Sequence, residues 1–257
     1  MNERSERQST APFEYVLRLA DDALVASQRL GEWVSKAPEL EEDMALANIA
    51  LDQLGQARLL LSYAGELEGE GRTEDDLAYL RTDREFRSCQ LVELAEGDFA
   101  VTIGKLLCFA AYQHQLYGWL KTKNDERLAA IAAKAEKETA YHLDHATMWT
   151  LRLGDGTPES HARMQAAVDE LWPYTHELFE TDELAQGVER AELGIDPSTL
   201  RPIWLSTVEK VLAEATLARP QDGWAPTGGR AGVHTEALSY LLSEMQSLHR
   251  THPGATW

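Results

Sequence analysis

Two carboxamides, Gln53 and Gln56, stand three positions apart inside an otherwise apolar stretch of the sequence. On a helix they share one stripe with the apolar residues Ile49 and Leu60. A spacing of three places two side chains on the same face, as the Glu and His ligands of a buried metal pair require. A neutral carboxamide is nevertheless a poor ligand for iron or manganese. The pattern therefore has the geometry of a metal site without its chemistry.

A second candidate set centres on Glu138 and His142, which are four residues apart. The position three residues before His142, where a paired metal ligand belongs, is Thr139. A Glu–His pair at the longer spacing can hold one metal ion loosely or form a hydrogen bond. We interpret it as a buried hydrogen-bonding pair, with Gln53 and Gln56 as candidate partners.

The remaining ligands of a two-metal site are missing from the sequence. A bundle with such a site needs one bridging carboxylate from each of two further helices. The segment Phe99–Asn124 contains no Asp or Glu, so it cannot supply one. The N-terminal segment offers Glu14, Asp21 and Asp22, and the Asp side chain is short for this role. A complete six-ligand site therefore cannot be assembled.

Three residues remain as candidates for a functional cluster, namely Asp22, Glu138 and His142. Their expected role is a buried hydrogen-bond network, because buried polar side chains in folded proteins almost always have partners. The alternative is an atypical metal-dependent oxidase, in which the same residues and His145 would bind metal. Metal analysis of the purified protein, repeated for His142→Ala, distinguishes the two.

Long helices must position these residues, and helices are the only regular structure that the sequence predicts. Apolar residues recur at helical spacing, and no alternating strand pattern is present. The segment Leu40–Leu67 is apolar almost all round, which is typical of a helix in the centre of a bundle. Further helices are predicted over Pro12–Gly31, Phe99–Lys121, Asp125–Leu153, Pro158–Glu180, Pro197–Arg219 and Thr235–His249.

The predicted helices indicate an all-α fold, a four-helix bundle with a long crossover and additional C-terminal helices. Residues 1–12 are charged and Ser-rich and are expected to be a disordered tail. Residues 13–257 are expected to form a single helical domain. The acidic segment Thr181–Thr199 and the Gly-rich segment Gly223–Gly232 are predicted to be loops.

Composition limits the possible partners. The chain has 257 residues, 24 Lys and Arg against 43 Asp and Glu, and a formal net charge of −19. This balance argues against nucleic acid or an anionic membrane surface as a partner. The first ten residues lack the apolar core of a signal peptide, and no apolar run is long enough to span a bilayer. The expected location is the cytoplasm.

Taken together, the motifs resemble those of the ferritin-like subunits of bacterial multicomponent phenylacetyl-CoA epoxidases, in particular their structural, non-catalytic subunits. The resemblance extends from about Tyr15 to Trp257. Its motifs are Leu30-Gly31-Glu32-Trp33, Ala37-Pro38-Glu39-Leu40, Ala47-Asn48-Ile49, Leu51-Asp52, Leu54-Gly55-Gln56-Ala57-Arg58, Glu138, Tyr141-His142-Leu143, Thr227-Gly228-Gly229, His234-Thr235-Glu236 and Glu244-Met245-Gln246.

The resemblance also implies where a metal site has been lost. In the catalytic chains of this family the central helix reads Asp-Glu-x-Gly-His, and the matching ligand positions here are Gln53 and Gln56. The second Glu-x-x-His of the family falls on Thr139 to His142, so only the His remains. The acidic ligand of the second helix falls near Ala110 or Ala111.

The function that the resemblance implies is structural. The chain would hold no metal or other cofactor, and would pair with and stabilise a related catalytic subunit that carries a di-iron site. A small bridging subunit and a reductase would complete the complex, which uses O2 to epoxidise the aromatic ring of phenylacetyl-CoA in aerobic phenylacetate degradation. A helical scaffold in another complex is a further alternative.

Overall fold

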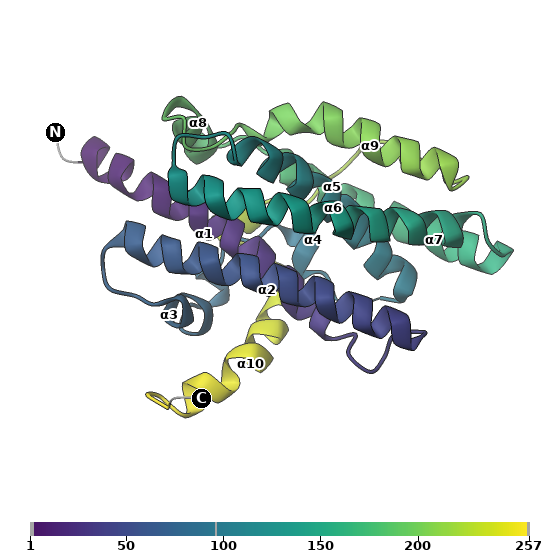
Figure 1. Cartoon of the computed structure of the whole chain (residues 1–257), viewed down its shortest axis with the longest axis horizontal. Coiled ribbons are helices and arrows are strands. Elements are labelled where there is room, and N and C mark those ends of the chain that lie inside the picture. Colours follow the sequence, from purple (N-terminus) through teal and green to yellow (C-terminus); the bar gives the residue numbers. More distant parts are fainter. Residues whose placement is uncertain (1–2, 96, 256–257) are drawn as a thin grey trace.

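A computed structural model describes residues 3–95 and 97–255 of the chain. Every regular element in those residues is a helix, as the sequence predicts. Four long helices form the bundle in Figure 1: α1 (Glu3–Gly31), α2 (Leu40–Glu68), α5 (Phe99–Leu120) and α6 (Glu126–Gly154). The expected all-α, ferritin-like four-helix architecture is confirmed.

The bundle consists of two helix pairs. Helix α1 packs along α2, α5 packs along α6, and α2 lies beside α6 at the front of Figure 1. The long crossover between the pairs contains the short helices α3 (Glu74–Tyr79), η1 (Asp83–Glu85) and α4 (Gln90–Glu93). It allows α5 to follow α2 in the chain while lying against a different layer of the bundle.

The remaining helices cover the outside of α5 and α1. Helix α7 packs on α5, α8 packs on α1, and α9 packs on both α5 and α6. Helix α10 extends from the body of the bundle and contacts α3 and η1 (Figure 1). These elements are α7 (Pro158–Leu171), η2 (Trp172–Phe179), α8 (Glu183–Arg190), η3 (Pro197–Leu200), α9 (Arg201–Glu214), η4 (Gly229–Ala231) and α10 (Glu236–Thr251).

Capping residues explain where the central helices begin. The Asp98 carboxylate accepts the backbone N–H groups of Ala100 and Val101 at the start of α5. The Asp125 carboxylate accepts the N–H of Leu128 at the start of α6. Both side chains satisfy donors that a helix terminus would otherwise leave unpaired. The predicted bounds of these two helices are therefore confirmed to within one residue.

Helix α2 does not occupy the centre of the bundle, so that prediction was wrong. Its buried side contains Leu46, Gln53 and Leu60, but its opposite side exposes Met44 and Leu51 to solvent. A helix that is apolar all round must be covered on every side, by its own chain or by another. The sequence could not distinguish these two situations, because both produce the same pattern.

Two predicted irregular segments contain helices. Helix α1 begins at Glu3, so residues 3–12 are helical where a disordered tail was expected, and residues 1–2 lie outside the described part of the chain. The N-terminal stretch contains Glu, Arg and Gln, which are good helix formers, and no Pro before Pro12. Helix α8 (Glu183–Arg190) lies inside the predicted loop Thr181–Thr199, with Asp182 as its N-cap.

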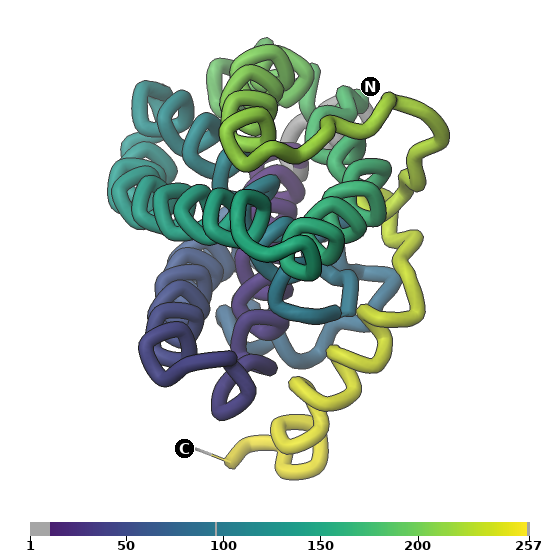
Figure 2. The backbone as a smooth tube through the Cα atoms, turned by 90° about the vertical axis from the view of Figure 1, so that its right-hand side faces the viewer, coloured from purple at the N-terminus to yellow at the C-terminus, as the bar shows by residue number. Residues whose placement is uncertain are grey.

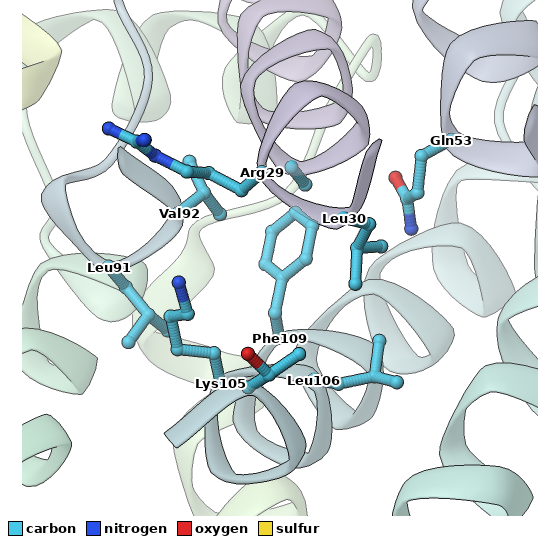
Figure 3. Close-up of a pocket in the computed structure, with 10 residues that line it drawn as sticks. Arg29, Leu30, Gln53, Leu91, Val92, Lys105, Leu106 and Phe109 are labelled. Carbon is cyan, nitrogen blue, oxygen red and sulfur yellow. The ribbon is translucent and has the colours of Figure 1, made fainter. Parts of the chain in front are cut away.

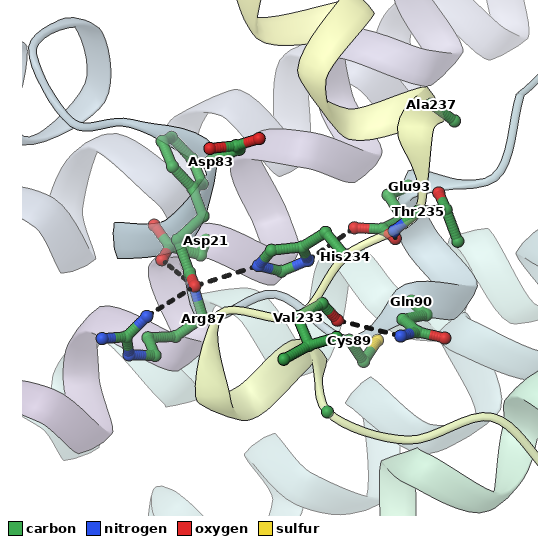
Figure 4. Close-up of polar contacts among 12 residues, drawn as sticks. Asp21, Asp83, Arg87, Cys89, Gln90, Glu93, Val233, His234, Thr235 and Ala237 are labelled. Carbon is green, nitrogen blue, oxygen red and sulfur yellow. Dashed lines mark hydrogen bonds and ion pairs between the residues drawn. The ribbon is translucent and has the colours of Figure 1, made fainter.

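A buried polar contact ties the start of α10 to α4 (Figure 4). The two ring nitrogens of His234 lie 2.7 Å from Glu93 Oε2 and 3.0 Å from the Phe86 carbonyl oxygen. The other oxygen of Glu93 accepts the backbone N–H of Thr235 at 2.6 Å. Since both neighbours of the ring are acceptors, both ring nitrogens must donate, which requires the charged imidazolium. This contact fixes the segment that leads into α10.

Candidate functional site

The two predicted carboxamides point into the bundle, and Gln53 is paired there with Gln113 of α5. Gln53 Nε2 donates to Gln113 Oε1 at 2.6 Å, and Gln113 Nε2 donates to Gln53 Oε1 at 3.1 Å. Both side chains are buried. The sequence analysis missed Gln113, which lies in the same acid-free segment that was searched for carboxylates. Together the two amides form a closed neutral pair that satisfies most of its own hydrogen-bonding groups.

The second carboxamide, Gln56, joins α2 to α6 through Glu138. Its Nε2 donates to Glu138 Oε2 at 3.0 Å, and the other oxygen of Glu138 forms an ion pair with the exposed Lys134. The Gln56 Oε1 atom is buried and has no protein partner among the described residues. Thus Glu138, which was expected to pair with His142, instead pairs with Gln56 and with a surface lysine.

His142 occupies the space between these two groups. Its Nε2 lies 3.0 Å from Asp52 Oδ2, and its Nδ1 lies 3.5 Å from Gln53 Nε2. These contacts fit the neutral ring with the proton on Nε2, since Nδ1 then accepts from the amide. Burial lowers the pKa of His142, while Asp52 and Glu138 act in the opposite direction without reversing the shift. At neutral pH the ring is therefore uncharged.

His145 lies outside this cluster, nearer to the surface end of α2. Its Nε2 is 3.3 Å from Glu42 Oε2, and burial lowers the pKa of its ring as well. The alternative oxidase would need His145 and His142 to converge on one metal ion. Each ring instead faces a different carboxylate, Glu42 or Asp52, on helix α2.

The other predicted site positions contribute no metal ligand. The Thr139 hydroxyl donates to the Ala135 carbonyl of its own helix at 2.9 Å. Ala111 is buried in α5. Asp22 belongs to a different network, because its carboxylate forms a two-pronged ion pair with Arg230, at 2.8 and 2.7 Å, and accepts the N–H of Cys89. The expected network of Asp22 with Glu138 and His142 is thus corrected.

A small cavity beside Gln53 shows which part of α1 faces the site (Figure 3). Its volume is about 40 Å³, and its walls are apolar side chains from α1, α4 and α5, with Arg29 and Lys105 also lining it. The residues of α1 that line it include Ala26 and Leu30, but not Asp22. A space of this size is close to that of a single water molecule. It leaves no room for a substrate of the size of an aromatic ring.

The donor atoms of this site do not fit a di-iron centre. In residues 3–95 and 97–255 there is no group of three or more His, Cys, Asp or Glu side chains that could hold a metal ion. Iron in such bundles is bound by carboxylates and imidazoles. Here the interior positions of α2 and α5 carry carboxamides that are already bonded to one another, and the two carboxylates nearest to them have other partners.

Truncating one half of the amide pair is expected to destabilise the protein moderately. Gln53→Ala leaves the buried Gln113 without its partner and removes a donor near His142, so we expect the free energy of unfolding to fall by about 1–3 kcal/mol. Urea denaturation monitored by circular dichroism measures this change. The matched control is Gln186→Ala on the exposed side of α8, which should stay within about 0.5 kcal/mol of the wild type. Equal effects at both positions would contradict the assigned role.

The state of His142 makes a prediction about pH. Because its pKa is lower in the folded than in the unfolded protein, its contribution to stability is present above about pH 6.5, the ordinary value for histidine. That contribution is lost as the pH falls through the lowered value. Asp52→Asn removes a group that raises this pKa, so the His142 resonance in an NMR titration should shift its midpoint further down. A midpoint that moves up would show that the ring is charged in the folded state.

Comparison with known proteins agrees with the resemblance of the motifs. The whole chain, residues 1–257, matches the family model described as phenylacetic acid catabolic protein. The chain is also 49% identical over 243 residues to a protein of Escherichia coli (strain K12) that is named as one of the subunits of 1,2-phenylacetyl-CoA epoxidase. That match covers 95% of this chain and 98% of the relative. Within residues 3–95 and 97–255 no helix is long and apolar enough to cross a membrane.

Proposed function

The chain belongs to the phenylacetic acid catabolic protein family, and from this premise we propose that it is the non-catalytic structural subunit of a phenylacetyl-CoA epoxidase complex. In this role it pairs with the di-iron catalytic subunit and stabilises it, in aerobic phenylacetate degradation. A small bridging subunit and a reductase are the further partners. The similar Escherichia coli protein is named as a subunit of an epoxidase, which supports membership of a complex.

The observation that carries this proposal is the Gln53–Gln113 pair. A buried carboxylate without a metal or a cation costs several kcal/mol in desolvation. A pair of neutral amides in the bundle interior avoids that cost and satisfies its own donors and acceptors. The interior of this bundle is therefore built to be stable without a metal, which is the property that a purely structural subunit needs.

The alternative function, an atypical metal-dependent oxidase, has less support. Its four residues are divided among three sets of contacts: Asp22 with Arg230, Glu138 with Gln56, and the two histidines each with a carboxylate of α2. The proposal places the chain in the cytoplasm, and the net charge of −19 supports the exclusion of nucleic acid and anionic membranes as partners.

Iron analysis and co-expression together test the proposed function. The chain purified alone is expected to contain much less than one iron per molecule and to show no epoxidase activity. Co-expression with the catalytic subunit should yield a stable complex and raise the soluble amount of that subunit. About one iron per chain that is lost in His142→Ala, or a catalytic subunit that is soluble and fully active alone, would overturn the proposal.

A further inference from the structure

The exposed side of α2 and α6 is the most apolar part of the surface among the described residues. Of the large hydrophobic side chains that are exposed to solvent, five lie on α2 and two on α6. We define the α2–α6 face by six of them: Leu40, Met44, Leu51, Leu59, Tyr141 and Met148. Surfaces of this kind, when contiguous, usually mark a site of protein–protein contact.

The spacing of these residues places them on one continuous surface. Leu40, Met44 and Leu51 are separated by steps of four and seven, and Tyr141 and Met148 by seven, so each set follows one side of its helix. Helices α2 and α6 lie side by side at the front of Figure 1, and both appear on the left in Figure 2. Contacts such as Asp52 with His142 hold the two helices together beneath the exposed residues.

The size of the α2–α6 face matches a stable interface. Each helix has 29 residues, which corresponds to a length of about 43 Å. With a width of about 10 Å for each helix, the pair presents roughly 800 Å², which is the area that one partner contributes to a standard protein–protein interface. The exposed fraction of 63% for Leu51 and 76% for Tyr141 shows that nothing in the described chain covers the middle of this face.

The charges around the face indicate what covers it. Glu41 and Asp144 are exposed, and the Asp52 side chain is 42% exposed. The nearby bases are Lys134, which is paired with Glu138, and Lys137. In a chain of net charge −19 this border favours a partner that brings apolar side chains with Lys and Arg around them. A second copy of the chain would bring its own excess of carboxylates to the contact.

We propose that the α2–α6 face is the surface through which this chain binds the catalytic subunit of its complex, an inference that rests on the proposed function. The partner buries Leu51 and Tyr141 at the centre of the contact and places basic side chains near Asp52 and Asp144. Helix α10 is the contrasting surface. It carries Tyr240 and Leu248, which are similarly exposed, but it lies away from the face, at the lower right of Figure 2.

Two double variants test this surface in pull-down and titration experiments with the tagged catalytic subunit. Leu51→Glu combined with Tyr141→Glu should weaken binding at least tenfold, because it puts two charges into an apolar contact. Tyr240→Glu combined with Leu248→Glu should bind like the wild type. Both variants change exposed residues, and their melting temperatures should stay within a few degrees of the wild-type value.

The outcomes separate the surface from the proposed function. If the wild type and both variants bind equally well, the complex exists but the α2–α6 face is not its interface. If the wild type itself fails to bind the catalytic subunit, the pairing proposal falls, and the assignment of the face falls with it. A homodimer of the isolated chain that the Leu51→Glu and Tyr141→Glu changes dissociate would overturn the catalytic subunit as the occupant.

Discussion

Replacing Asp22 by alanine is expected to lower the free energy of unfolding by about 3–5 kcal/mol, the largest single effect in this protein. The substitution leaves the Arg230 guanidinium largely buried without its carboxylate, and it removes the acceptor of the Cys89 N–H. The exposed fractions of the two side chains are only 4% and 14%, so water cannot replace the lost partner. Differential scanning calorimetry should show a drop in Tm of roughly 10 °C.

The control for this substitution is a surface ion pair of similar geometry. Glu159 and Arg163 lie one helical turn apart on α7 and are both well exposed. Glu159→Ala should change stability by less than about 1 kcal/mol. The double variant Asp22→Leu with Arg230→Met should recover part of the lost stability, since an apolar pair leaves no charge unpaired. A loss for Asp22→Ala that is as small as that for Glu159→Ala would contradict a role in fixing the C-terminal segment.

Most helix boundaries could be predicted from the sequence, because they depend on local chemistry. Asp98 and Asp125 cap α5 and α6 at the predicted positions, and Pro158 begins α7. The position of α2 in the bundle could not be predicted in the same way. Hydrophobic periodicity reports which side chains avoid water, but it does not report whether the same chain or another chain covers them. The exposed Leu51 shows where that ambiguity led to a wrong prediction.

The candidate site was predictable only in part, for a similar reason. The spacing of Gln53 and Gln56 on one side of α2 is a local property, and the structure places both inside the bundle. Their partners lie 60 and 82 positions away in the chain, and no local pattern identifies them. The same is true of Asp22, whose partner Arg230 is 208 positions away. The buried pairs of this protein are therefore set by how its helices pack.

Glu93→Gln is expected to weaken the attachment of α10 in a pH-dependent manner. Burial by itself lowers the pKa of His234, but the hydrogen bond and charge of Glu93 outweigh it, so the pKa is raised above the ordinary value of 6.5. The contact therefore stabilises the wild type fully below about pH 6.5 and is lost as the pH rises through the raised value. Asp83 and Glu177, which carry further negative charge near the ring, act in the same direction.

In the Glu93→Gln variant the neutral amide cannot support the imidazolium, so stability at pH 6 should fall by about 2–3 kcal/mol. Because His234 then has no reason to stay protonated, the variant should also lose the decline in stability that the wild type shows above pH 6.5. Urea unfolding between pH 6 and pH 9 measures both effects, and hydrogen exchange should show faster opening near Thr235. The exposed Glu236→Gln is the control. If the wild type and Glu93→Gln declined equally with rising pH, the charge on His234 would not hold α10 in place.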